Sequence, residues 1–142
     1  IIVDILSRLQ DASDLCRCRM ASNHLLRLSA HVHSIRFYCT YNELLRSRRP
    51  EVQIPPFKAM VKKMLLELVQ VHSVRFHMEE SMQRLCYEDE EGELSDYWLT
   101  DVDFVMGWVE HVGLSLKELC MTDFWQQSCW RRTQILSAIS TH

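Results

Sequence analysis

The chain has 142 residues, enough for one domain or for two small modules that share a core. With only 3 Gly and 3 Pro it lacks the tight turns of an all-β sandwich or barrel, and its 47% apolar residues exclude a wholly disordered chain. A formal net charge of −3 argues against a general nucleic-acid or membrane-surface binder, and no apolar run approaches the roughly 18 residues of a membrane span.

Three short helices are predicted within the first 30 residues. Residues 1–9 carry apolar side chains on one helical face, namely Ile1, Ile2, Ile5, Leu6 and Leu9. Asp11 and Ser22 are good starts for the second and third helices. Their apolar positions are Leu15, Cys18, Leu25, Leu26 and Leu28. A unit this small is not very stable alone, so its apolar face is either an interface or the edge of a larger core.

From residue 31 the hydrophobic period changes. Residues 33–39 alternate, with Ile35, Phe37 and Cys39 on one face, which predicts a half-buried strand. Residues 41–55 read as a loop that contains the basic run 46–50. Residues 57–68 have the clearest helical pattern of the chain, and the two prolines before them suit a helix start.

The second half repeats this order. Residues 72–78 nearly copy residues 33–39 and predict a second strand. The acidic stretch 88–93 reads as a flexible connection. A helix follows from residue 102, begun by Thr100 or Asp101 and ended by Gly113 as a C′ residue. A third strand is expected over 116–121, and a last amphipathic helix from Trp130.

The three predicted strands share one spacing of apolar residues. They read Val-x-x-Ile-x-Phe from residue 32, Val-x-x-Val-x-Phe from residue 71, and Leu-x-x-Leu-x-Met from residue 116. This is the L-x-x-L-x-L pattern of leucine-rich repeats, and it predicts an α/β fold of β-α units with a small parallel sheet. The units, offset by 39 and 45 residues, exceed the usual 20–29 and lack an Asn after the strand, so an ordinary βαβ layer is the alternative.

The non-core positions of such strands stack side by side on one surface. Four of them form a candidate substrate-binding set: Arg36, Tyr38, Arg75 and His77. Two Arg and two aromatic-type side chains in register suit an acidic or phosphorylated segment. A solvated outer face is the alternative, since exposed Arg is common.

Residues 1–30 resemble an F-box. The match rests on residues 1–9 as its first helix, on Ser-Asp-Leu-Cys-Arg-Cys-Arg over 13–19, and on Ala-Ser-Asn-His-Leu-Leu-Arg-Leu over 21–28. The Leu-Pro that opens the family pattern would lie before residue 1. Its usual Val, Lys and aromatic residue are replaced here by Ala21, Asn23 and Leu25. Together with the β-α units, the chain is similar to plant-type F-box proteins with leucine-rich-repeat-like C-terminal parts.

The resemblance implies an F-box-like module over 1–30 and a repeat region over 31–142. It implies a non-catalytic substrate receptor of a Skp–cullin–F-box ubiquitin ligase, whose partners are a Skp-type adaptor, a cullin scaffold reached through it, and a protein substrate. The expected adaptor-binding residues are Ile2, Ile5, Leu6, Leu9, Leu15, Cys18, Asn23 and Leu25. The alternative is a repeat-type scaffold with a degenerate F-box.

Other functions have weaker support. The chain holds no nucleotide-binding glycine motif and no hydrolase or metalloprotease motif, so we expect no catalytic site, cofactor or metal site. A small enzyme with a reactive Cys is a distant third reading. Six irregularly spaced cysteines indicate mostly buried, reduced thiols and a cytoplasmic or nuclear protein. The chain starts without Met inside one apolar run and stops inside another, so we expect a fragment that is truncated within its repeats.

Overall fold

The structure, a computed structural model, describes all residues except 10, 50, 52–54, 89–93, 125–127 and 141–142. Its helices are α1 (Ile2–Arg8), α2 (Ala12–Ala21), α3 (Asn23–Ser29), α4 (Tyr41–Ser47), α5 (Phe57–Leu66), α6 (Gln83–Glu88), α7 (Val102–Val112) and α8 (Ser128–Ser140). Its strands are β1 (Ser34–Cys39), β2 (Ser73–Met78) and β3 (Glu118–Thr122), and two 3-10 turns cover Glu80–Met82 and Ser95–Tyr97.

The three strands form one parallel sheet in the order β1-β2-β3. Ile35 lies opposite Val74, and Val74 lies opposite Leu119. These pairings are the 39- and 45-residue offsets of the sequence, so the α/β class and the small parallel sheet are confirmed. The third strand begins two residues later than expected, at Glu118.

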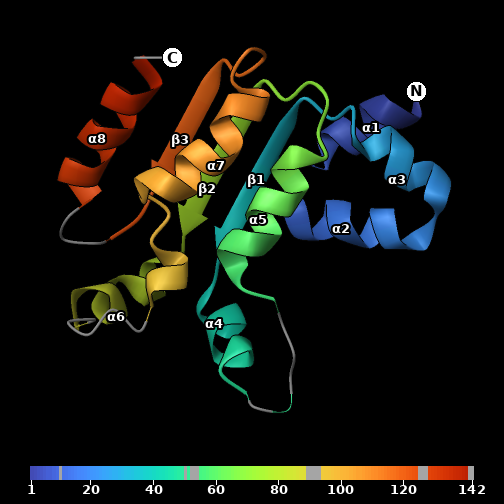
Figure 1. The fold of residues 1–142 in the computed structure, drawn as a ribbon. Coiled ribbons are helices and arrows are strands. Elements are labelled where there is room, and N and C mark those ends of the chain that lie inside the picture. The colour runs from blue at the N-terminus through green and yellow to red at the C-terminus, as the bar shows by residue number, and fades with distance from the viewer. Residues whose placement is uncertain (10, 50, 52–54, 89–93, 125–127, 141–142) are drawn as a thin grey trace.

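Helices α5 and α7 cover one face of the sheet, and α8 packs against α7 beyond β3 (Figure 1). Every second side chain of each strand points toward these helices, and these side chains form the core together with the helices. Phe76 stands at its centre, with ring centroids 5.3 Å from Phe37, 6.1 Å from Phe104 and 5.8 Å from Trp108. The opposite face of the sheet carries the polar strand positions.

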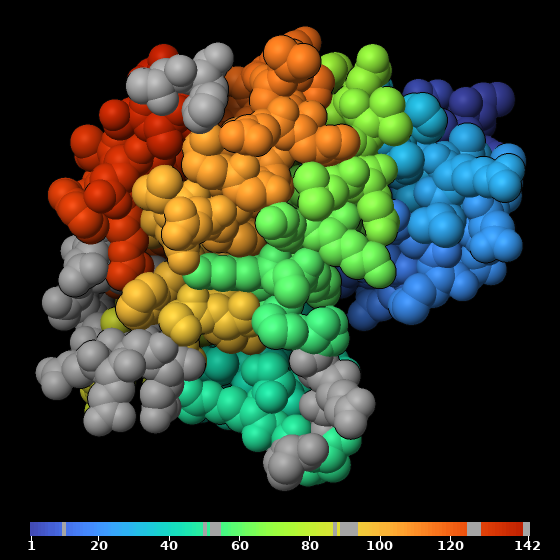
Figure 2. All heavy atoms as spheres, viewed as in Figure 1, coloured from blue at the N-terminus to red at the C-terminus, as the bar shows by residue number. Residues whose placement is uncertain are grey.

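The N-terminal helices lie at the β1 edge and share the core of the sheet. Leu6 and Leu15 belong to the same cluster of buried side chains as the strand residues. Arg19 of α2 pairs with Glu67 just after α5, Cys16 of α2 contacts Met64 of α5, and the N-terminal helices lie beside α5 in the sphere view (Figure 2). The two predicted modules, 1–30 and 31–142, are therefore in continuous contact, and their division stays a prediction.

The segment 41–47 is a helix, so the loop expected there is wrong. Thr40 accepts a hydrogen bond from the backbone N–H of Glu43, and Leu44 is buried. Thr40-x-x-Glu43 is a capping-box sequence, which indicates the start of a helix. The basic run that follows it led to the prediction of a loop instead. The end of the expected loop, residues 50 and 52–54, lies outside the described residues.

Two further differences concern helix ends. Residues 80–88 form a 3-10 turn and α6, which the sequence analysis did not predict. Most of the acidic stretch (89–93) lies outside the described residues. Gly113 ends α7 as expected, but with φ of −57° it is not a left-handed C′ residue. A Cβ there would lie 2.7 Å from the carbonyl oxygen of Val109, so space rather than φ favours glycine.

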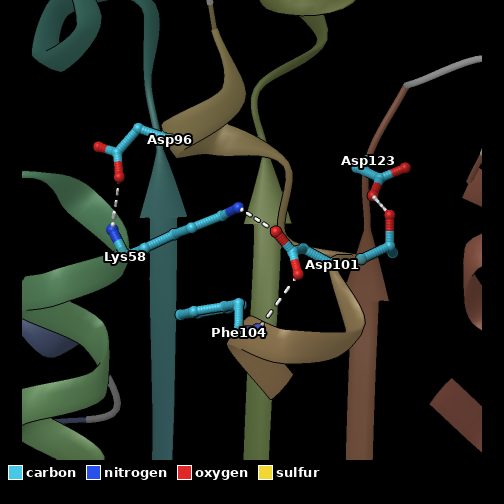
Figure 3. A network of polar contacts seen from close by, with 6 residues as sticks. Lys58, Asp96, Asp101, Phe104 and Asp123 are labelled. Carbon is cyan, nitrogen blue, oxygen red and sulfur yellow. Dashed lines mark hydrogen bonds and ion pairs between the residues drawn. The ribbon is translucent and has the colours of Figure 1, made fainter. Parts of the chain in front are cut away.

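Carboxylates at the carboxyl end of the sheet fix where α5 and α7 begin (Figure 3). Asp96 accepts hydrogen bonds from the backbone N–H groups of Phe57 and Lys58. Asp101 accepts from the backbone N–H of Phe104 at 3.2 Å and from Lys58 Nζ at 2.9 Å. The helices that cover the sheet are thus tied to each other at their first turns.

Burial raises the pKa of Asp101, but the hydrogen bonds from Lys58 and the N–H of Phe104 outweigh it and hold the pKa below its usual value. A lowered carboxyl pKa stabilises the fold above the unfolded-state pKa of about 4 and loses this effect as the pH falls through the folded-state value. We expect D101A to cost about 1–2 kcal/mol at pH 7.

Urea unfolding between pH 7 and pH 2 measures this effect. The difference between the wild type and D101A should shrink as the pH falls from about 4, the unfolded-state value, through the lowered pKa of Asp101 in the folded protein. The control is D103A, which removes an exposed carboxylate from the same helical turn. An equal loss in both variants, or a difference that does not change with pH, would contradict the assigned role.

Candidate functional site

The first candidate surface lies on the three N-terminal helices, which expose large apolar side chains. They are Ile1, Ile2, Ile5, Met20 and Leu26. Ile5 is 57% exposed, whereas Leu6, its neighbour on α1, is buried in the core. The seven-residue helix α1 therefore turns one side toward α3 and the core and the other toward solvent. Exposed apolar residues on a small helical unit suit contact with another protein.

The eight residues predicted to bind an adaptor fall into three groups. Ile2, Ile5 and Asn23 are exposed, and Leu9, Cys18 and Leu25 are half-buried. Leu6 and Leu15 are buried, with Leu15 at 0% exposure. The expectation that Ile1 to Leu9 form a single face needs correction, because the face is divided between core and solvent. Substitutions at Leu6 or Leu15 would test folding rather than binding.

The second candidate surface is the face of the sheet that no helix of the described chain covers. The pairing of β1 with β2 places Arg36 beside Arg75 and Tyr38 beside His77, and β3 adds Cys120 and Thr122. The predicted juxtaposition of the four candidate residues is confirmed, and its use in binding stays a prediction. These side chains line a shallow hollow of about 250 Å³.

Hydrogen bonds hold the two arginines of this hollow in place. Arg75 Nη2 donates to both carboxylate oxygens of Glu118, at 2.8 and 3.1 Å. The bonds from Arg75 and Ser73 lower the pKa of Glu118, which stays charged at neutral pH. Arg36 Nη1 donates to the Tyr38 hydroxyl at 2.8 Å, and the Tyr38 ring meets His77 edge-on at 5.6 Å.

Glu118 is the one member of this network that sequence reasoning missed. The 45-residue offset that aligns Arg75 with Cys120 also aligns Ser73 with residue 118. Applied to every strand position, this offset would have found the carboxylate.

Histidines and cysteines elsewhere in the described part of the chain form no cluster of metal ligands. His33 stacks on His72, with ring centroids 4.8 Å apart, because the 39-residue offset places them side by side. No group of three or more potential metal ligands occurs among the described residues. No disulfide joins the six cysteines, and of these described residues only Cys39 and Cys86 are buried, so the expectation of mostly buried thiols is only partly met.

A larger hollow, of about 570 Å³, lies beyond the carboxyl end of β1, between α4, the start of α5 and the turn 95–97. The basic run contributes Arg46 and Arg48 to its lining. Phe57 and Tyr97 stack in its wall at 5.5 Å, and Asp96 binds the first turn of α5. Its walls thus consist of side chains that join helices, and we assign it a structural role.

The chain is similar to a curated F-box/LRR-repeat protein of Arabidopsis thaliana, with 36% identity over 141 residues. The match covers 99% of this chain but 31% of the relative, so the chain spans about a third of that protein's length. No family model matches the chain, and no solved structure matches it. Among the described residues, no helix has the length and apolar character to cross a membrane.

Proposed function

We propose that the chain belongs to the F-box/LRR proteins and acts as a substrate receptor of a Skp–cullin–F-box ubiquitin ligase. The observation that carries the proposal is the 36% identity to an F-box/LRR-repeat protein across nearly the whole chain. The fold supports it independently, because three short N-terminal helices precede a parallel β-α array. The bond-making chemistry then belongs to the partner enzymes.

The adaptor would bind the exposed apolar side of the N-terminal helices. Ile2 and Ile5 lie one turn apart on α1, on the side turned away from the core. The groove of a Skp-type adaptor would take such side chains in a helix-in-groove contact. Of the eight residues predicted from the sequence, these two are the apolar ones that are exposed.

The substrate would bind the open face of the sheet, at the hollow around Arg36 and Arg75. Because α2 shares its core with β1, the adaptor-binding helices hold a fixed direction relative to this face. A receptor of this kind raises the effective concentration of a substrate lysine near the ubiquitin-loaded enzyme. Together with this role we propose a cytoplasmic or nuclear location and a module boundary at residue 30.

The double variant I2D/I5D tests the adaptor surface. Two carboxylates would have to be desolvated in an apolar groove, so we expect about 100-fold weaker adaptor binding, or about 2.7 kcal/mol. Isothermal titration calorimetry of the chain with a purified Skp-type adaptor measures this loss. Circular dichroism should show an unchanged fold, since both side chains are exposed.

The matched control is L136D on α8, which changes an equally apolar side chain that is 68% exposed and far from α1 in the fold. It should bind the adaptor like the wild type. Equal affinities for the wild type, I2D/I5D and L136D would refute the assigned surface. A folded wild-type chain that does not bind the adaptor at all would favour the repeat-type scaffold with a degenerate F-box.

A further inference from the structure

Two tight turns expose apolar side chains at the amino end of the sheet. Val69 lies in the turn before β2 and is 61% exposed, and Leu114 lies in the turn before β3 and is fully exposed. The 45-residue offset that pairs β2 with β3 also relates these two residues, so they occupy equivalent places in successive units. Neither side chain is part of the hydrophobic core.

Hydrogen bonds to the neighbouring unit hold both turns in place. The Val69 N–H donates to the carbonyl oxygen of Ala30 at 2.8 Å, directly after α3. The hydroxyl of Ser115, next to Leu114, donates to the carbonyl oxygen of Val71 at 2.9 Å. The two exposed side chains therefore stand on fixed backbone, and a partner that covers them orders less of the chain than it would on a mobile loop.

The apolar row continues into the N-terminal helices. Ala30, which is bonded to Val69, follows α3, and Leu26 lies one turn earlier on this helix and is 40% exposed. Helix α1 packs against α3, and α1, the end of α3 and the two turns lie toward the same end of the sheet (Figure 1). A row of exposed apolar residues along one edge marks an interaction surface, whereas single scattered ones do not.

A second row, of histidine and lysine side chains, runs beside the apolar one. His33, His72 and Lys117 each precede a strand. The N–H of His72 donates to the carbonyl oxygen of His33 at 2.7 Å, and the N–H of Lys117 donates to that of His72 at 2.8 Å. Lys117 is exposed and pairs with no carboxylate of the described chain, and its neighbour Glu118 is bonded to Arg75. Such an edge complements apolar side chains that have acids beside them.

We propose that the amino edge of the sheet is a second contact surface for the Skp-type adaptor, with Val69 and Leu114 as its apolar contacts and Lys117 as its charged contact. The inference rests on the proposed receptor function and extends its partner surface beyond residue 30, into the repeat region. The facing surface of the adaptor would present apolar side chains with carboxylates beside them.

The position of this edge favours the adaptor as its occupant. Neighbouring strands are about 4.8 Å apart, so the turn before β3 lies only about 10 Å across the sheet from the segment that joins α3 to β1. A standard protein interface covers about 800 Å² on each partner, so a protein bound to α1 and α3 can reach both turns. The formal net charge of −3 disfavours an anionic membrane.

The test measures adaptor binding by the full chain with isothermal titration calorimetry. V69D/L114D places two carboxylates in an apolar contact beside acidic groups, so we expect about tenfold weaker binding. V69K/L114K should weaken binding only about threefold, because the lysine stems cover apolar surface and their charges are attracted to acids. K117E should weaken binding about threefold, and this loss should fade at about 0.5 M salt.

The matched control is L45D on α4, which lies beyond the carboxyl end of β1 and carries Leu45 at 43% exposure. It should bind the adaptor like the wild type. Circular dichroism should show the same fold for all variants, since every changed side chain is exposed. If V69D/L114D does not fold, K117E decides the question, because it changes no apolar side chain.

Wild-type affinity in V69D/L114D and K117E, together with a loss in I2D/I5D, would overturn this inference and leave the receptor function in place. A folded wild-type chain that does not bind the adaptor would overturn both. Loss of binding in V69D/L114D but not in I2D/I5D would support the amino edge and show that the surface assigned on α1 is wrong. Sedimentation with phosphatidylcholine–phosphatidylserine vesicles tests a membrane as occupant. Vesicle binding that V69D/L114D abolishes, with adaptor binding unchanged, would contradict the inference.

Discussion

The variant F76A is expected to lower the free energy of unfolding by about 3–5 kcal/mol, enough to unfold a large fraction of a marginally stable chain at 37 °C. Phe76 is buried at the centre of the core and contacts aromatic rings from β1 and α7. Its removal leaves a cavity between the sheet and the helices that cover it. Urea denaturation followed by circular dichroism measures the loss.

The control for this prediction is the next residue on the same strand. His77 points to the open face and is exposed, so H77A should change the unfolding free energy by less than about 0.5 kcal/mol. Comparable losses in F76A and H77A would mean that the two faces of β2 do not differ as the structure shows.

The variant L15A should destabilise the whole chain by about 2–5 kcal/mol, not only the N-terminal helices. Leu15 lies on α2, is fully buried and belongs to the core that includes the strands. All four tryptophans lie between residues 98 and 130, so tryptophan fluorescence reports only on the repeat region. We expect the urea midpoint measured by this fluorescence to fall in L15A.

The control is M20A, which shortens a side chain on the same helix that is 81% exposed, and which should leave the midpoint unchanged. A wild-type tryptophan transition that is retained in L15A, while circular dichroism shows loss of helix, would mean that the module 1–30 folds independently. The predicted domain division would then describe two cooperative units rather than one.

The sheet could be predicted from the sequence because its signal is local and repeated. Strand side chains alternate with a period of two, and the near copy of residues 33–37 at residues 72–76 fixed both the pairing and the register. The juxtaposition of Arg36 with Arg75 followed from the same offset. In adjacent parallel strands, all paired residues are separated by the same number of positions in the sequence, so one offset identifies every pair in contact.

The division of α1 between core and solvent, and the partner of Arg75, could not be predicted, because both depend on contacts that the sequence does not specify. The apolar positions of α1 share a helical period whether they face the core or solvent, so the division between Leu6 and Ile5 required knowledge of where β1 lies. The ion pair of Arg75 with Glu118 depends on the side-chain directions of two strands. Helix α4, in contrast, could have been predicted, because the residue that caps it, Thr40, can be recognised in the sequence.

The two candidate surfaces are joined through one shared hydrophobic core. The N-terminal helices contact β1 directly, and Arg19 pairs with Glu67 across the junction. A substrate held on the open sheet face would thus keep one orientation relative to an adaptor held on α1. This arrangement is what the proposed receptor function requires of the fold.

Hydrogen–deuterium exchange of the chain, measured with and without a purified Skp-type adaptor, tests the central claim most directly. The account predicts slower exchange in α1 to α3 on addition of the adaptor, with α7, α8 and the sheet unchanged. No change anywhere, with the chain shown to be folded, would contradict the receptor function. Protection confined to the sheet face or to α8 would show that the adaptor surface is not on the N-terminal helices.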